Sequence, residues 1–163
     1  MSTIQFKQTT TATPEQFIAG LTHFGPGRSE IFGNSAQRYL KVHDQGIDYA
    51  DVTEGTGAVW ERLRFDWSDP NRVVLTTTDS IIYGGGSGYT YTLARRRDGT
   101  TNVDIVVVRE GRNFKGRLLA LLLSSVGKRS VINGFGKTVT AIEARHYAAS
   151  PADSQAPTMG LVC

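Results

Sequence analysis

Between Gln37 and Glu110 the chain alternates apolar and polar residues, and this period of two limits its fold more than any other feature. Such alternation is typical of β-strands with one buried face. Turn sequences interrupt it at residues 44–46, 54–57, 68–71, 84–86 and 98–99. The pattern predicts six strands, at residues 37–43, 47–53, 58–67, 72–79, 88–97 and 101–110. Because these connections are too short for parallel crossovers, most of the sheet is expected to be antiparallel.

One more strand and a short helix are predicted ahead of this segment. Residues 3–11 alternate apolar and polar side chains and are rich in threonine, which suits a half-buried first strand. Thr13 is placed to cap a helix that begins at Pro14 and ends before Gly25. A short helical turn at residues 28–32 is expected to follow.

The period becomes helical after residue 112. Apolar residues at helical spacing predict one long helix over residues 113–146, with a kink near its glycines, Gly127, Gly134 and Gly136. The remaining segment contains two prolines and little periodicity. We therefore expect a single domain over residues 1–148 and a disordered tail over residues 149–163.

The composition of this 163-residue chain excludes several classes of protein. Hydrophobic residues make up 39% and charged residues 20%, a globular balance that argues against a disordered chain or an integral membrane protein. The net charge of +3 comes from basic residues scattered along the chain, so we expect no nucleic-acid partner. Cys163 is the lone cysteine, which excludes an intrachain disulfide and favours the cytoplasm. The three histidines lack metal-ligand spacing, and neither a metal nor a cofactor is expected.

The order strand, short helices, six strands and long helix resembles the helix-grip fold of the START-like superfamily, also called SRPBCC. Segments at residues 59–67, 90–93, 98–101 and 115–119 look like actinobacterial members of its polyketide cyclase/dehydrase and lipid transport family. The resemblance implies an α+β fold in which a curved, seven-stranded, mostly antiparallel sheet wraps around a long C-terminal helix, with short helices after the first strand. It also implies a cavity between the sheet and that helix for an apolar or amphipathic ligand.

The more apolar face of each strand is predicted to line this cavity. The phase of the strand that contains Tyr49 stays open, because both of its faces are mixed. The predicted ligand-binding residues are Tyr49, Glu61, Leu63, Phe65, Leu75, Thr77, Tyr89, Tyr91, Ile105, Val107, Arg109, Leu118 and Leu122.

Glu61 and Arg109 are the two charged residues on this apolar face. Since an isolated buried charge is costly, both are expected to be paired, wetted or near the cavity mouth. One interpretation is a polar pair that orients a ligand and makes both residues the catalytic candidates. The other is a salt bridge at the rim without a further role.

The primary functional hypothesis is the binding or transfer of a hydrophobic small molecule such as a lipid, polyketide, sterol-like compound or isoprenoid. An alternative is a cyclase or dehydratase in which Glu61 is a general acid or base and Arg109 stabilises an enolate. A third is an interaction module, monomeric or homodimeric, that uses Trp60 and residues 118–123. Basic residues flank that apolar run, which also allows transient contact with an anionic membrane.

Overall fold

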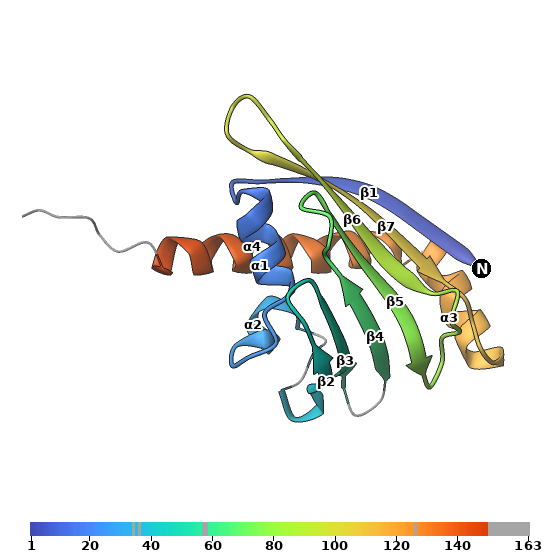
Figure 1. Cartoon of the computed structure of the whole chain (residues 1–163). Coiled ribbons are helices and arrows are strands. Elements are labelled where there is room, and N and C mark those ends of the chain that lie inside the picture. Colours follow the sequence, from blue (N-terminus) through green and yellow to red (C-terminus); the bar gives the residue numbers. More distant parts are fainter. Residues whose placement is uncertain (34, 36, 57–58, 126, 150–163) are drawn as a thin grey trace, which may run out of the picture.

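The computed structural model describes residues 1–33, 35, 37–56, 59–125 and 127–149 (Figure 1). Its strands are β1 (Ser2–Thr10), β2 (Lys41–Gln45), β3 (Tyr49–Gly55), β4 (Trp60–Asp66), β5 (Arg72–Ser80), β6 (Gly88–Arg95) and β7 (Thr101–Arg109). Its helices are α1 (Pro14–Leu21), α2 (Arg28–Ile31), the 3-10 turn η1 (Gln37–Tyr39), α3 (Phe114–Ser125) and α4 (Lys128–Ala149). The strand predicted from residue 37 thus starts as a 3-10 turn and becomes extended at Lys41.

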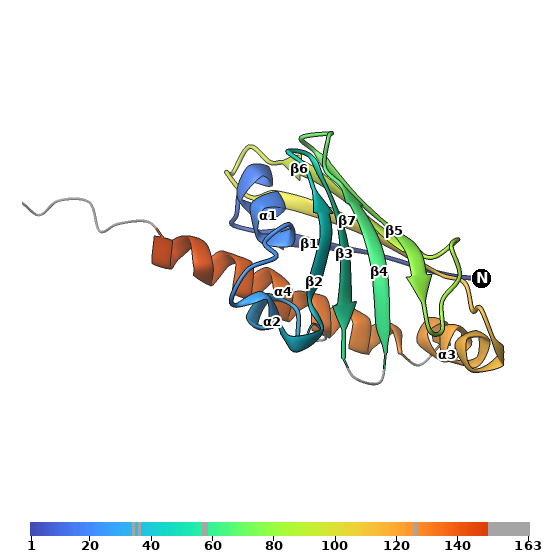
Figure 2. The same ribbon diagram turned by 60° about the horizontal axis from the view of Figure 1, so that its bottom comes forward.

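The seven strands form one antiparallel sheet in the order β1-β7-β6-β5-β4-β3-β2. Consecutive strands from β2 to β7 are neighbours, as the short connections predicted, and β1 pairs with β7 from Ser2 opposite Arg109 to Thr10 opposite Thr101. The sheet curves over α4, which runs beneath its concave face (Figure 2). This arrangement confirms the predicted helix-grip architecture.

Helix α1 begins where its sequence predicts. The backbone N–H of Gln16 donates to the Thr13 hydroxyl, and the backbone N–H of Thr13 donates to the Gln16 side chain, which completes a capping box ahead of Pro14. The helix then passes close to α4 at Gly20, where a Cβ atom would lie 2.8 Å from the Ile142 side chain. A larger residue at position 20 would separate the two helices.

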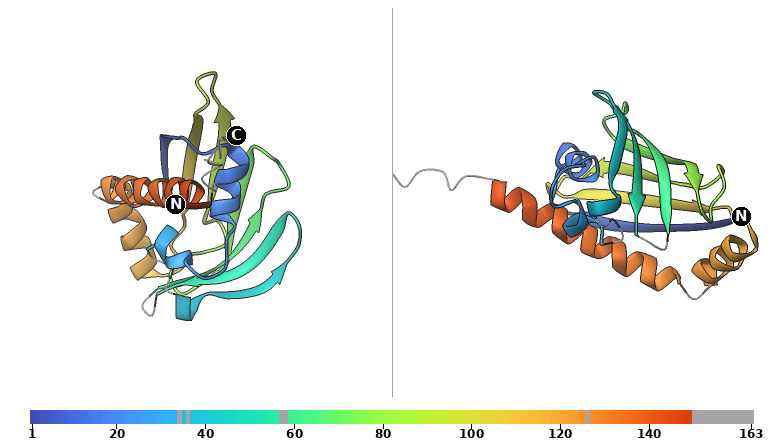
Figure 3. Two further views of the ribbon diagram at one scale, coloured as in Figure 1. Left: turned by 90° about the vertical axis from the view of Figure 1, so that its left-hand side faces the viewer. Right: turned by 90° about the horizontal axis from the view of Figure 1, so that it is seen from below.

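The prediction of one long helix over residues 113–146 is wrong, because the segment forms α3 and α4 as two separate helices. The second begins directly after Gly127, whose backbone N–H donates to the Leu122 carbonyl at 2.9 Å. The break between the two helices falls at Gly127, one of the glycines near which the sequence predicted a kink. Figure 3 shows the result: α4 follows the sheet, and α3 turns away at the end opposite α1 and α2.

The core lies between the concave face of the sheet and α4. Phe135, Val139 and Ile142 point from α4 into this layer and are at most 9% exposed. Helix α4 continues to Ala149, whereas the rest of the predicted tail, with Cys163, lies outside the described residues. In the described part of the chain, no helix combines the length and apolarity needed to cross a membrane.

Candidate functional site

A cavity of about 700 Å³ lies between the concave face of the sheet and helices α2 and α4. Its volume falls within the range of small-molecule sites, about 300–1,000 Å³. Apolar and aromatic side chains from strands and helices make up most of its wall, among them Phe6, Leu21, Ile31, Phe32, Val131 and Phe135. The wall also carries polar and charged side chains, namely Arg28, Glu30, Glu54, Glu61, Ser130, Lys137 and Thr138. A cavity with both kinds of side chain suits a ligand that is largely apolar and has a polar group.

Eight of the residues predicted from strand alternation lie in this wall. They come from β4, β5, β6 and β7 and are Glu61, Leu63, Phe65, Leu75, Tyr89, Tyr91, Ile105 and Val107. The register explains why they meet, because Phe65 lies opposite Leu75, Leu75 opposite Tyr89, and Tyr89 opposite Val107. Directly opposed residues project from the same face of an antiparallel sheet. That they bind a ligand stays a prediction.

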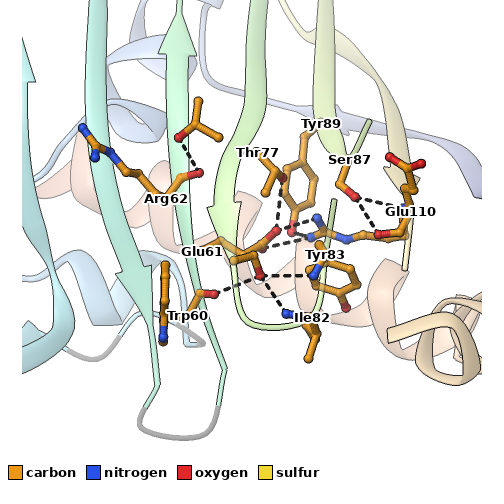
Figure 4. A network of polar contacts seen from close by, with 12 residues as sticks. Trp60, Glu61, Arg62, Thr77, Ile82, Tyr83, Ser87, Tyr89 and Glu110 are labelled. Carbon is orange, nitrogen blue, oxygen red and sulfur yellow. Dashed lines mark hydrogen bonds and ion pairs between the residues drawn. The ribbon is translucent and has the colours of Figure 1, made fainter. Parts of the chain in front are cut away.

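Glu61 and Arg109 form an ion pair at the edge of the cavity. Arg109 Nη1 donates to Glu61 Oε1 at 2.9 Å, and Nη2 donates to Oε2 at 3.3 Å. Arg109 also donates to the Tyr89 hydroxyl, while the Thr77 hydroxyl donates to Glu61 at 3.3 Å. Figure 4 shows Glu61, Thr77 and Tyr89 converging from β4, β5 and β6. Arg109 and Thr77 thus lie behind Glu61 rather than in the wall itself.

Burial sets the electrostatics of this cluster. The Glu61 and Arg109 side chains are only 13% and 8% exposed. Burial raises the pKa of Glu61 above its usual value, and the nearby Arg109 guanidinium opposes that shift without cancelling it. The rings of Tyr83 and Tyr89 each lie 4.3 Å from the guanidinium carbon of Arg109, which adds cation–π stabilisation.

Tyr49 lies outside the cavity, contrary to the prediction. Its hydroxyl donates to Asp44 at 3.1 Å, and the Arg64 guanidinium stacks 3.9 Å from its ring. The inward face of β3 carries Ala50 and Val52, both fully buried. Because side chains alternate along a strand, burying these two turns Tyr49 outward.

Leu118 and Leu122 also lie outside the cavity wall. Both are on α3 and are 49% exposed. Because α3 and α4 are separate helices, the C-terminal part of the wall comes from α4 instead, through Val131, Phe135 and Thr138.

A second buried ion pair, Arg28 with Glu54, was not among the predicted site residues. Arg28 is fully buried, and its Nε and Nη2 donate to the two Glu54 carboxylate oxygens at 3.0 and 3.2 Å. Its Nη1 donates to the carbonyls of Leu21 and His23 at 2.6 and 3.2 Å. The guanidinium carbon also lies 4.1 Å from the Phe32 ring. This pair closes the wall where α2 meets β3.

A sequence signal for this pair exists in the β3 alternation. Glu54 follows Ala50 and Val52 at every second position, so it points inward once the strand phase is known. An inward carboxylate requires a partner, although nothing local identifies Arg28, which lies 26 residues earlier. Among the described residues, no cluster of three or more histidines, cysteines, aspartates and glutamates is arranged to hold a metal ion.

Comparisons with known proteins place the fold. A Thermus thermophilus protein superposes with a TM-score of 0.68 at 14% identity, over 91% of this chain and 99% of that one. An aromatase/cyclase, Zhui, from a Streptomyces species gives 0.66 at 16% identity, over 91% and 97% of the two chains. A START superfamily protein from Mycobacterium smegmatis gives 0.64 at 8% identity, over 91% and 99%.

The chain therefore has the START-like helix-grip fold that the sequence resemblance implied. No family model matches the sequence. No curated protein matches it either. Since this fold supports several unrelated functions, the residues of the cavity indicate the function better than the fold does.

Proposed function

We propose that this protein binds an apolar or amphipathic small molecule between its sheet and α4, and carries it without covalent chemistry. The observation that supports this most directly is the cavity of about 700 Å³ with largely apolar walls. Burial of apolar ligand surface contributes roughly 25 cal/mol per Å² before the costs of ordering are subtracted. The START superfamily protein among its structural neighbours fits this proposal.

Two adjacent valines on β7 provide the test. Val107 lines the cavity, and Val106 lies on the opposite face of the same strand. We expect Val107→Trp to place an indole ring in the cavity and weaken binding of N-phenyl-1-naphthylamine, a neutral fluorescent probe, whereas Val106→Trp binds it like the unmodified protein. Circular dichroism checks that both variants are folded.

Native mass spectrometry with solvent extraction of freshly purified protein then identifies any molecule carried through purification. Weaker probe binding in both variants, or in neither, contradicts the proposed location. A folded protein that binds no probe and releases no small molecule contradicts the proposed function itself.

A cyclase or dehydratase is the second candidate, favoured by one observation. Glu61 is a largely buried carboxyl group in the cavity wall with a raised pKa, which is how proteins prepare a general acid or base. The aromatase/cyclase among the structural neighbours has the same fold. Arg109, however, donates hydrogen bonds to Glu61 and to Tyr89 and does not line the cavity. In this arrangement it would position Glu61 rather than stabilise an enolate.

The two candidates differ in what Glu61→Gln does. A carrier variant still binds N-phenyl-1-naphthylamine and leaves a linear poly-β-ketone thioester unchanged, as the unmodified protein does. An enzyme cyclises the thioester without a change of mass, which chromatography detects as a new isomer, or also dehydrates it, which mass spectrometry detects as loss of water. Glu61→Gln then loses that turnover but still binds the probe.

We also propose that α3 docks on an anionic membrane surface when ligand is exchanged. Phe114, Leu118 and Leu121 recur at helical spacing and are 82%, 49% and 65% exposed. Residues 111–142 contain six basic residues and no aspartate or glutamate. An exposed apolar helix face among basic side chains matches the chemistry of an anionic lipid surface.

A further inference from the structure

The buried charges beside the cavity are paired with one another. Arg28 directs its guanidinium to Glu54 and to two backbone carbonyls, and Arg109 directs its own to Glu61 and Tyr89. Each buried guanidinium therefore already has a carboxylate, and the two pairs add no net charge to the interior. Lys137 and Glu30 also line the cavity, but both are exposed at its rim and opposite in charge.

A carboxylate ligand meets no unpaired cation inside such a cavity. Moving an ionised carboxylate from water into an apolar space costs several kcal/mol unless a cation or several hydrogen-bond donors receive it. The carboxylates of Glu54 and Glu61 in the wall accept hydrogen bonds from arginines and can donate none to a ligand carboxylate. An uncharged ligand avoids the cost of the unpaired charge.

Tyr91 supplies a polar group deep in the wall, whereas Ser130, another hydroxyl residue of the lining, is exposed. Tyr91 is 4% exposed and lines the cavity from the centre of β6, where it lies opposite Val73 and Ile105. Its ring is held between Tyr89, with centroids 6.4 Å apart, and Phe135, with centroids 5.7 Å apart. No group in the described ranges hydrogen-bonds to its hydroxyl.

That hydroxyl borders the cavity. In the described part of the chain, every side-chain nitrogen or oxygen that is completely buried has a hydrogen-bond partner. The Tyr91 oxygen has none, so it retains accessible surface, and the cavity is the space that this residue lines. Burial also raises the pKa of Tyr91, so its hydroxyl stays protonated at neutral pH and can both donate and accept.

We infer that the cavity selects uncharged ligands whose hydroxyl or carbonyl group hydrogen-bonds to Tyr91, and rejects ligands of similar shape that carry a carboxylate. This inference rests on the proposed binding function and deepens it by naming the chemical class of the ligand. A ligand hydroxyl would accept from Tyr91 or donate to it, and a ligand carbonyl would accept.

The test compares a long-chain fatty alcohol with the fatty acid of the same chain length. Both are titrated at about pH 8, where a free fatty acid is ionised, and binding is followed by displacement of N-phenyl-1-naphthylamine. We expect the alcohol to displace the probe at a concentration at least about tenfold lower than the acid, since one unpaired buried charge costs more than the corresponding free energy.

Two tyrosine variants locate the contact. Tyr91→Phe keeps the ring and removes the hydroxyl, and we expect it to weaken alcohol binding about two- to tenfold, the range of one net hydrogen bond. Tyr49→Phe makes the same change on the outer face of the sheet and should leave alcohol binding unchanged. Glu61→Gln removes the carboxylate that is paired with Arg109, and it should reduce the difference in affinity between the acid and the alcohol.

Each result bears on a different statement. Acid binding as tight as alcohol binding overturns the inferred selectivity, and an unchanged alcohol affinity in Tyr91→Phe overturns the role of Tyr91. In both cases the probe still binds, so the proposed function stands. A folded protein that never binds the probe overturns the function and the selectivity together.

Discussion

At the scale of single residues, the two buried arginines are held in different ways. Arg28 is enclosed on every side, by Glu54, by two carbonyls and by the rings of Phe24, Phe32 and Phe65. Arg109 supports a carboxylate that faces the cavity. We therefore expect Arg28 to matter chiefly for stability and the Glu61–Arg109 pair for the chemistry of the cavity.

Replacing Arg28 should destabilise the protein strongly. Arg28→Met leaves the Glu54 carboxylate without its cation, and removal of one partner of a buried pair costs about 3–5 kcal/mol. Arg62→Met is the matched control, because its pair with Asp51 lies on the outer face with side chains 41% and 18% exposed. That control should cost no more than about 1 kcal/mol.

Urea unfolding measures both changes. Adding Glu54→Gln to Arg28→Met should recover part of the loss, since it removes the unpaired charge. Equal costs for Arg28→Met and Arg62→Met would contradict the structural role assigned to Arg28.

The raised pKa of Glu61 makes stability depend on pH in a defined direction. As pH rises from about 4, the unfolded chain releases this proton first, near the usual glutamate pKa of about 4.3. The folded protein keeps the proton until pH reaches the raised value, so the stability contributed by Glu61 is complete below the usual pKa and is lost through this window. Compared with Glu61→Gln, the unmodified protein should lose unfolding free energy over that interval.

Urea unfolding of both proteins at several pH values gives this difference directly. Titration of the other carboxyl groups affects both proteins alike and cancels. A difference that grows in favour of the unmodified protein as pH rises would mean that attraction to Arg109 outweighs burial.

At the scale of elements, α3 lies at one end of the molecule, away from the cavity. It contributes little to the cavity and presents Phe114, Leu118 and Leu121 to solvent at the end of the sheet away from α1 and α2 (Figure 3). Its Gly116 packs against the backbone at Ile82, where a Cβ atom would clash with the carbonyl oxygen. This close contact fixes the start of α3 against the connection between β5 and β6.

The proposed docking of α3 predicts binding to vesicles that contain phosphatidylserine. Phe114→Ser with Leu118→Ser should reduce co-sedimentation severalfold, because both remove apolar surface. Ile47→Ser is the matched control, since Ile47 is 94% exposed at a distant turn. Vesicles of phosphatidylcholine alone, or added salt, should weaken binding. Equal binding to both vesicle types, or an equal loss in Ile47→Ser, would count against the proposal.

Some features of the strands and helices could be predicted from the sequence, and others could not. Alternation determined the inward faces of β4 to β7, because their apolar and polar faces differ clearly. It did not determine which face of β3 points inward. One face carries Tyr49 and Asp51 and the other carries Ala50 and Val52, and burial of either is compatible with the sequence. The division into α3 and α4 was hidden by a leucine-rich run that continues the helical pattern up to Gly127. Burial of Arg28 depends on a strand 26 residues away, which local patterns do not encode.

At the scale of the whole molecule, the sheet and α4 enclose the cavity with residues from nearly the full length of the chain. Phe6 from β1, Ile31 from α2, Ile105 from β7 and Phe135 from α4 all contribute to its wall. Between the two helices that line this wall, the Thr138 hydroxyl on α4 donates to the Ile31 carbonyl on α2 at 2.9 Å. The cavity is thus a property of the complete fold and of no single motif.

During synthesis, β1 emerges long before the strand with which it pairs. Ser2–Thr10 pairs with Thr101–Arg109, which is made about a hundred residues later. At synthesis rates of about 5–20 residues per second, the delay is on the order of 5–20 s. Throughout it, Ile4 and Phe6 have neither β7 beside them nor α4 beneath them. Pairing over such sequence separation is also slow to form. β1 of a nascent chain therefore stays accessible to chaperones and proteases until β7 and α4 have been translated.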